Sequence, residues 1–175
     1  HKTVPLMMAG PLNKGRALAA ALGYPRHIVC DAGHAAGTRL RDFGGFGDRN
    51  GPRNALLVEC GQHWEPAAAD VAIESTLRFL LHFGMIDRAF AAPHLTTALP
   101  PQTTIEVTDA VTIGSDGFAF ADKFLGMEVL ARAGTPIGTD GDRTVVTPYD
   151  DCVLIMPSRR LQKGQTAVRL GRLVD

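Results

Sequence analysis

The chain has little of several features that would assign a class of protein at once. Its 18 Lys and Arg residues are balanced by 18 Asp and Glu residues, so its formal net charge is zero. This balance excludes the basic surface typical of nucleic-acid-binding proteins and of polybasic membrane patches. The apolar runs are short and interrupted, which argues against a transmembrane helix, and no secretory signal is recognised before the first strand-like run. We therefore expect neither a nucleic-acid nor a membrane partner.

Cysteine is also scarce. The three cysteines, Cys30, Cys60 and Cys152, are far apart, odd in number and without CxxC spacing. This pattern excludes a disulfide framework and a structural zinc site of the usual kind. Cys30 and Cys152 lie in apolar runs and read as small buried side chains. A reducing, cytoplasmic location fits this usage best.

What the chain does have is enough apolar sequence for a packed core. It contains 175 residues, of which 45% are hydrophobic and 21% charged, enough for one ordinary domain or two small ones. In the first half, strand-like and helix-like patterns alternate, which favours an α/β sheet of parallel type. The predicted strands are 4–9, 27–31 and 54–59, and the predicted helices are 12–22 and 66–83.

The pattern changes after a connection that contains Pro93, Pro100 and Pro101. Short strand-like runs separated by turn residues then follow, which predicts a small all-β, barrel-like domain. We place the domains at 1–98 and 99–175. The predicted strands of the second domain are 104–108, 110–113, 145–147, 152–156 and 167–170.

One stretch, 54–65, combines a buried-strand pattern with polar residues directly after it. Its apolar run predicts a central parallel strand that ends on Glu59, with Gly61 allowing close backbone approach. Chemistry in open α/β sheets gathers at the carboxyl ends of such strands. Glu59 is therefore a candidate functional carboxylate, although a Glu that caps or salt-bridges at a sheet edge would give the same pattern.

The segment 38–53 is rich in glycine and charge, so it has little to bury and should form a surface loop. Long loops of this kind beside a strand end are often binding loops. A flexible solvated connection remains the alternative.

The motifs of the first half resemble the succinylglutamate desuccinylase/aspartoacylase family. The resemblance is carried by Leu57-Val-Glu-Cys-Gly61 with the helix and β-rich region after it, by Pro5–Pro11, by Asp31–Gly37 and by Glu59–Glu65. It implies a zinc carboxypeptidase-like α/β catalytic domain that hydrolyses the amide of an N-acyl amino acid or a comparable small molecule. It also implies that Glu59 acts as general base and then general acid beside a zinc-bound water.

The zinc ligands that the resemblance implies, an HxxE pair and a later His, are not found in this sequence. No His has Glu three positions later, and His1 stands too close to Leu6 to match the later ligand. We therefore expect zinc in the full-length protein, with its ligands upstream of His1, no metal ligand within the chain, and an inactive chain when it is taken alone.

The resemblance also suggests residues that contact the substrate. An Arg about ten residues before the catalytic Glu corresponds to Arg49, with Arg53 as its near neighbour, and the guanidinium fork suits a carboxylate. Tyr149 of the second domain, His63 and His34 are further candidates. Each has a plainer reading, as a surface Arg, as a turn Tyr packed on the β domain, or as a His without a role.

The alternative function is a noncatalytic binding or oligomerisation module that contains the β barrel. Residues 134–164 resemble a lipoyl- or biotinyl-carrier barrel, but the Met-Lys pair that a carrier needs is missing. The oligomeric state is left open, with a homo-oligomer as one option.

Overall fold

The computed structural model describes residues 4–32 and 38–174. These residues divide into two compact units, which we call the N-terminal unit (Pro5–Thr104) and the C-terminal unit (Ile105–Val174, with Val4). The first mixes helices and strands, and the second is built from strands. The molecule is thus mixed α/β, as the alternating and then strand-rich patterns predicted.

The N-terminal unit contains three short strands, β1 (Leu6–Met8), β2 (His27–Cys30) and β3 (Leu57–Glu59), in the order β3-β1-β2. β1 and β2 run parallel, whereas β3 runs antiparallel to β1. β4 (Thr103–Thr112) begins beside β2, where the Thr103 N–H donates to the Arg26 carbonyl at 2.9 Å. The strands of this unit therefore form a mixed arrangement.

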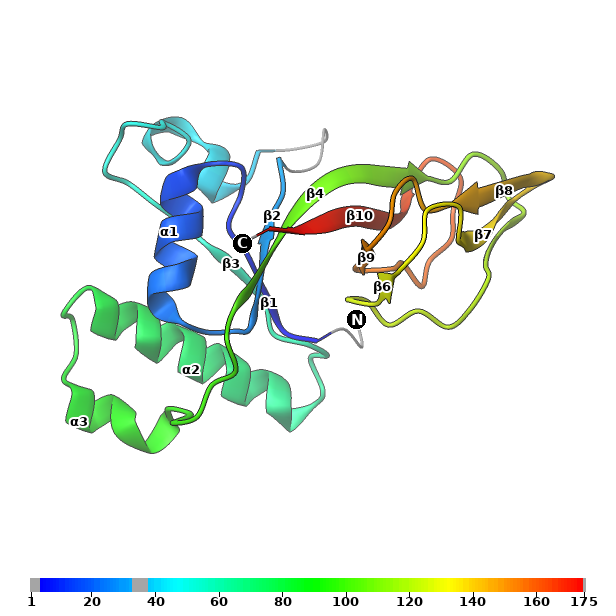
Figure 1. Ribbon diagram of the computed structural model, residues 1–175. Helices are drawn as coiled ribbons and strands as arrows, with labels where there is room; N and C mark the ends of the chain where they lie inside the picture. The colour runs from blue at the N-terminus through cyan, green and yellow to red at the C-terminus, as the bar shows by residue number, and fades with distance from the viewer. Residues whose placement is uncertain (1–3, 33–37, 175) are drawn as a thin grey trace. The chain divides into compact units, whose positions relative to one another are not determined.

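Two helices, α1 (Asn13–Leu22) and α2 (Pro66–His82), cover one face of these strands (Figure 1). Gly15 lets α1 approach β1 closely, because a Cβ at this position would lie 2.1 Å from the Ala9 carbonyl oxygen. α1 ends at Gly23, whose φ of 69° is left-handed and which donates its N–H to Ala20, as expected for a helix C-terminus. The buried cluster on this face comprises Met7, Ala9, Leu18, Ala19, Leu22 and Ile28, with Val58 and Phe79 packed against it.

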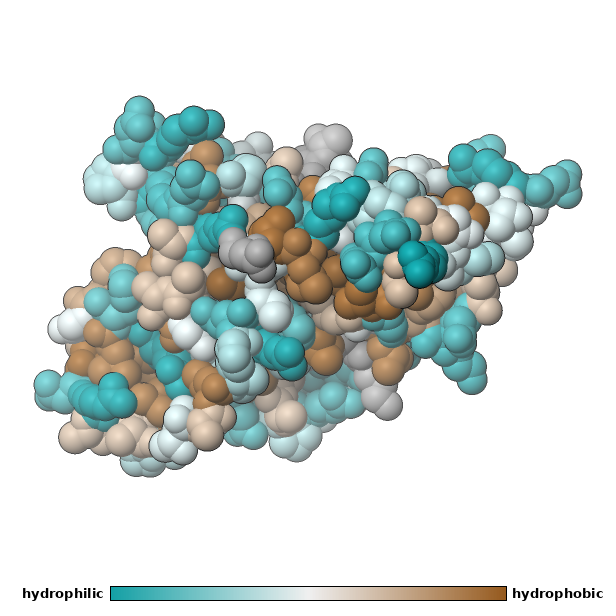
Figure 2. Space-filling view, viewed as in Figure 1, coloured by the Kyte–Doolittle hydropathy of each residue, from teal (hydrophilic) through white to brown (hydrophobic). Residues whose placement is uncertain are grey.

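Short helical turns fill the connections. The long loop before β3 contains two 3-10 turns, η1 (Leu40–Asp42) and η2 (Gly44–Phe46), and the segment after α2 contains α3 (Arg88–Ala91) and η3 (Ala92–His94). Figure 2 shows hydrophobic residues at the surface around α2 and α3. Ile73 of α2 and Phe83, Met85 and Phe90 after it are exposed apolar side chains.

Buried Glu74 fixes the segment after α2 to that helix. Its Oε1 accepts from Arg78 Nε at 2.9 Å and from the Thr96 N–H at 2.9 Å, and its Oε2 accepts from Thr96 Oγ1 at 2.8 Å. The side chain is only 7% exposed, so these bonds replace its hydration. The buried residues of α2 are Val71, Glu74, Ser75 and Leu77, whereas Ile73 is exposed.

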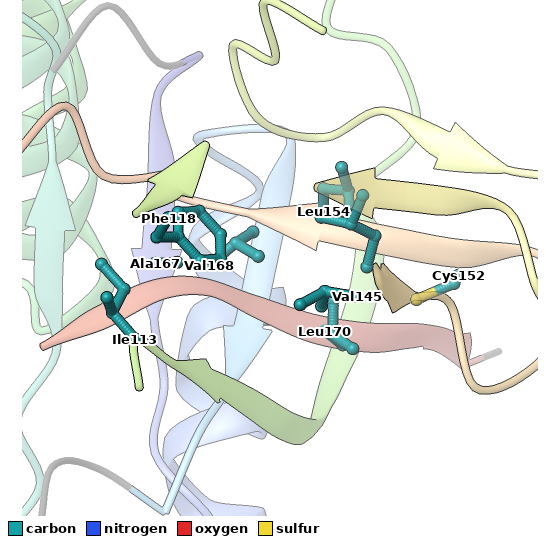
Figure 3. Packing of buried hydrophobic residues seen from close by; sticks show 9 residues of the cluster. Ile113, Phe118, Val145, Cys152, Leu154, Ala167, Val168 and Leu170 are labelled. Atoms are coloured by element: carbon teal, nitrogen blue, oxygen red, sulfur yellow. The ribbon is translucent and has the colours of Figure 1, made fainter. Parts of the chain in front are cut away.

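The C-terminal unit consists of strands in two groups, with the orders β4-β10-β9-β6 and β5-β7-β8. One buried hydrophobic cluster of this unit draws on both groups (Figure 3). The cluster residues are Ile113, Phe118, Ile137, Val145, Cys152, Leu154, Ala167, Val168 and Leu170. The strands beyond β4 are β5 (Phe118–Phe120), β6 (Val129–Leu130), β7 (Pro136–Asp140), β8 (Arg143–Val146), β9 (Cys152–Ile155) and β10 (Thr166–Val174).

Two sequence expectations for this unit need correction. Residues 103–112 form one strand, where the sequence suggested two, because the exposed Asp109 continues the extended backbone without breaking it. β5, β6 and β7 were not predicted, since their short runs are interrupted by Gly, Asp and Thr. Among the described residues, no helix is long and apolar enough to cross a membrane.

Candidate functional site

Glu59 lies at the end of β3, where it is paired in register with Leu6 of β1. The prediction of a central parallel strand is wrong: β3 is antiparallel to β1, and in the described part of the chain it has no second neighbour. An apolar run does not encode strand direction, which explains the error. The prediction that a strand ends on Glu59 is confirmed.

The two faces of β3 differ. Val58 and Cys60 line a largely apolar hollow of about 320 Å³ against α2, together with Ser75 and Phe79. Because side chains alternate along a strand, Glu59 projects to the opposite face. Glu59 is half-buried, and among the described residues no donor is hydrogen-bonded to its carboxylate. The carboxylate is therefore not tied up in an architectural ion pair within the part of the chain that the structure describes.

The Glu59 carboxylate affects the ionisation of the neighbouring Cys60 thiol. Burial raises the pKa of Cys60, and the negative charge of Glu59 raises it further. A thiol kept in its neutral form is a poor nucleophile. Glu59 is thus the more suitable of the two side chains for chemistry in which a proton moves.

The chain leaves β3 through Gly61, whose φ of 118° favours glycine, and then turns into α2. Gln62 is buried and its carbonyl accepts from the Glu65 N–H at 3.0 Å. His63 is exposed, and Trp64 is 78% exposed. The sequence singled out His63 in this turn and overlooked Gln62, because nothing in the local pattern shows which of two adjacent polar residues points inward.

Arg49 and Arg53 are both exposed and lie in the loop that precedes β3. Arg53 packs against Gly45, since a Cβ added to Gly45 would lie 3.3 Å from Arg53 Cδ. The loop contacts the first turn of α1, which follows the carboxyl end of β1, whereas Glu59 is level with the amino end of that strand. The two arginines and Glu59 therefore flank opposite ends of β3, and the strand rises about 7 Å between Leu57 and Glu59.

A buried arginine that the sequence reading missed lies at the carboxyl ends of β1 and β2. Arg41 is 6% exposed; its Nη2 donates to the Asp31 carbonyl at 3.2 Å, and its Nε lies 3.4 Å from Asp42 Oδ1. Its Nη1 has no hydrogen-bond partner among the described residues. Burial lowers the pKa of Arg41, and the charge of nearby Arg39 lowers it further.

An unsatisfied guanidinium N–H at a strand end can donate a hydrogen bond to an anionic ligand, because buried donors are seldom left unpaired in folded proteins. Arg39 presents a second such group, since its Nη2 is also buried without a partner in the described part of the chain. The Arg39-x-Arg41-Asp42 spacing at the start of the glycine-rich loop was the available signal, but only the fold shows that Arg41 is buried.

The remaining candidates are placed elsewhere. His34 lies outside the described residues. Tyr149 belongs to the C-terminal unit, where its hydroxyl is hydrogen-bonded to Thr108 Oγ1 and the Arg172 guanidinium carbon lies 3.6 Å from its ring centre. Burial raises the pKa of Tyr149, so its hydroxyl stays protonated at neutral pH. These contacts hold Tyr149 within the fold of the C-terminal unit.

No group of three or more His, Cys, Asp or Glu side chains in residues 4–32 and 38–174 could hold a metal ion. The residues that the structure describes therefore do not fit a zinc ion by themselves. The expectation that zinc ligands lie upstream of His1 stays a prediction.

Comparisons with known proteins give a consistent view of the fold. No family model matches the sequence, and no curated protein matches it. Solved structures do match: succinylglutamate desuccinylase from Vibrio cholerae aligns over 99% of this chain with a TM-score of 0.64 and 18% identity. The succinylglutamate desuccinylase of Vibrio parahaemolyticus aligns over 100% of this chain with a TM-score of 0.62 and 17% identity.

A succinylglutamate desuccinylase/aspartoacylase from Rhodobacter sphaeroides aligns over 99% of this chain with a TM-score of 0.63 and 12% identity. The aligned part is 50% of each Vibrio chain and 55% of the Rhodobacter chain, so this chain spans about half the length of the structures it matches. The chain therefore has the fold of one part of the succinylglutamate desuccinylase/aspartoacylase structures, which confirms the fold that the sequence motifs implied.

Proposed function

We propose that this chain is part of a hydrolase that cleaves the amide bond of an N-acyl amino acid or a similar small molecule, with Glu59 as the group that moves the proton. The observation that carries the proposal is the placement of Glu59. It ends a strand in a fold shared with desuccinylase structures, it is half-buried, and no described residue binds its carboxylate.

The proposed chemistry is a simple transfer. The Glu59 carboxylate accepts a proton from a water molecule as the water oxygen bonds to the acyl carbon. Glu59 then delivers that proton to the amide nitrogen as the C–N bond breaks, which releases a carboxylic acid and a free amine. A rigid strand suits this role, because proton transfer needs the carboxylate within hydrogen-bond reach of both atoms.

Substrate recognition is the second part of the proposal. Arg49 and Arg53 at the other end of β3 would bind the substrate carboxylate, and buried Arg41, whose Nη1 has no partner among the described residues, is a third candidate. A small N-acyl amino acid that lies along β3 would place its amide at Glu59 and its carboxylate toward the arginines. His63, His34 and Tyr149 remain candidate contacts.

Zinc is the cofactor that the family resemblance implies. Because the described residues do not bring together a ligand set for it, we assign no step to zinc through this chain. Everything proposed here concerns proton transfer by Glu59 and recognition of a carboxylate by arginine side chains.

The test uses the full-length polypeptide that carries this chain, incubated with a panel of N-acyl amino acids that differ in acyl group and in amino acid. Release of free amine is followed by reaction with a fluorogenic amine reagent. We expect hydrolysis of at least one member, and no hydrolysis of the matching acyl amide that lacks the amino-acid carboxylate. Absence of amine release across the panel would favour the noncatalytic module.

A further inference from the structure

The turn that carries the two exposed arginines has little secondary structure of its own. Within residues 48–53, the Gly51 N–H donates to the Asp48 carbonyl at 3.2 Å, and the Asn50 N–H donates to Asp48 Oδ1 at 3.0 Å. These two bonds close a single turn but do not attach it to the rest of the unit. A turn of this kind would ordinarily move freely.

Lys14, in the first turn of α1, attaches it. Its Nζ donates to the carbonyl of Asp48 at 2.5 Å, of Arg53 at 2.7 Å and, more weakly, of Gly51 at 3.4 Å. An ammonium has three N–H donors, so these contacts use its full capacity. Within the described residues Lys14 forms no ion pair, and backbone carbonyls are its partners.

The attachment is reciprocal. Asn54, just after the turn, donates from Nδ2 to the Lys14 carbonyl at 2.7 Å, and its Oδ1 accepts from the Ala55 N–H at 3.0 Å. A cation near a helix N-terminus opposes the helix dipole, so the position of Lys14 is not explained by the stability of α1. The ammonium is better explained by the carbonyls that converge on it.

We propose that Lys14 is a positioning residue that holds the 48–53 turn in place, and with it the guanidinium groups of Arg49 and Arg53. This inference rests on the proposed function, which assigns those arginines to the substrate carboxylate. Lys14 itself touches neither the substrate nor the reacting atoms. It acts by fixing the backbone from which the two arginines project.

The first arm of the test reads the turn directly and needs no catalytic activity. Trypsin cleaves after Arg49 and Arg53, and the rate of cleavage at these bonds, followed by mass spectrometry, reports how often the turn opens. We expect the Lys14→Met variant to be cut there about tenfold faster, as loss of one or two net hydrogen bonds would allow. Lys163→Met, an exposed lysine of the C-terminal unit, is the matched control and should change nothing.

Cleavage after Arg78 separates local opening of the turn from unfolding of the N-terminal unit. Arg78 lies inside α2 and its guanidinium is bound to Glu74, so trypsin reaches this bond when the N-terminal unit unfolds. In Lys14→Met this bond should be cut at the native rate. Unchanged cleavage after Arg49 and Arg53 would overturn the proposal, and so would equal acceleration at all three bonds.

A rescue experiment tests the carbonyl cluster itself. In Lys14→Ala the three carbonyls lose their cation, and added ethylammonium chloride should slow cleavage after Arg49 and Arg53 again. Sodium chloride at the same ionic strength should not. No protection by the alkylammonium ion would contradict a role for the carbonyls as the anchor.

The second arm is kinetic and uses the full-length polypeptide. Lys14→Met should raise KM for the N-acyl amino acid about tenfold with kcat nearly unchanged. In a double variant that already carries Arg49→Met and Arg53→Met, adding Lys14→Met should raise KM little further. If the arginine variants raise KM and Lys14→Met does not, the positioning role is wrong while the proposed anchors stand. If neither raises KM, the arginine anchors fail, and the inference fails with them.

Discussion

The two units of the molecule use their buried polar groups differently. In the C-terminal unit, buried Asp140 accepts from the Gly114 N–H at 2.7 Å, the Ser115 N–H at 2.8 Å and Ser115 Oγ at 2.6 Å, so its bonding capacity is well used. In the N-terminal unit, Arg41 is buried and its Nη1 has no hydrogen-bond partner among the described residues, and none of them binds the Glu59 carboxylate. Satisfied groups hold a fold together, whereas unsatisfied ones are available to a ligand.

The contrast holds inside the N-terminal unit as well. The Glu74 carboxylate is bound by Arg78 of α2 and by Thr96, so its role is structural. Glu59, also on a regular element, has no such shell in the described residues. Replacing members of the two classes should therefore separate losses of activity from losses of stability.

The largest expected effect is on turnover. Glu59→Gln keeps the shape of the side chain but cannot accept a proton, so kcat should fall about 10³-fold while the free energy of unfolding stays within about 0.5 kcal/mol. The measurement is steady-state amine release together with urea unfolding. Glu106→Gln, an exposed carboxylate on β4, is the matched control and should keep native turnover.

The next effect is on stability. Glu74→Gln leaves Arg78 without its counter-charge in a largely buried place, and should lower the free energy of unfolding by about 2–4 kcal/mol. Urea unfolding followed by circular dichroism measures it. A loss below about 1 kcal/mol would show that the comparison overstates the architectural role of Glu74.

A smaller effect is expected at Arg41. If its unpaired N–H binds the substrate carboxylate, Arg41→Met should raise KM about 10- to 100-fold, the value of one or two charge-assisted hydrogen bonds. Arg41→Lys, which keeps the charge but loses the fork, should give an intermediate KM. An unchanged KM in both variants would assign Arg41 to the architectural class.

The smallest effect concerns acid stability. Hydrogen bonds from Ser115 and the Gly114 backbone hold the pKa of Asp140 below its ordinary value of 3.8. A carboxyl whose folded pKa is lowered stabilises the fold above its unfolded pKa, and this contribution is lost as the pH falls through the folded value. The free energy of unfolding should therefore decline less steeply below about pH 4 in Asp140→Asn than in the native chain. Equal slopes would show that Asp140 contributes nothing to acid sensitivity.

Particular residues show how far the sequence could predict this molecule. Helix α1 was predicted within one residue at its start, because its apolar spacing and Gly23 are local signals. The family motif around Glu59 predicted the fold. The direction of β3 could not be predicted, since it depends on pairing with a strand 50 residues away. The burial of Arg41 depends on how the 38–53 loop packs against Gly10, and no local pattern encodes that contact.

The central claim is that Glu59 moves a proton and does not bind the substrate or support the strand. Its most direct test is the dissociation constant of an N-acyl amino acid for the Glu59→Gln polypeptide, measured by titration calorimetry. The account predicts a value within about threefold of the native one, although turnover is nearly abolished. Loss of binding in proportion to the loss of turnover would contradict it.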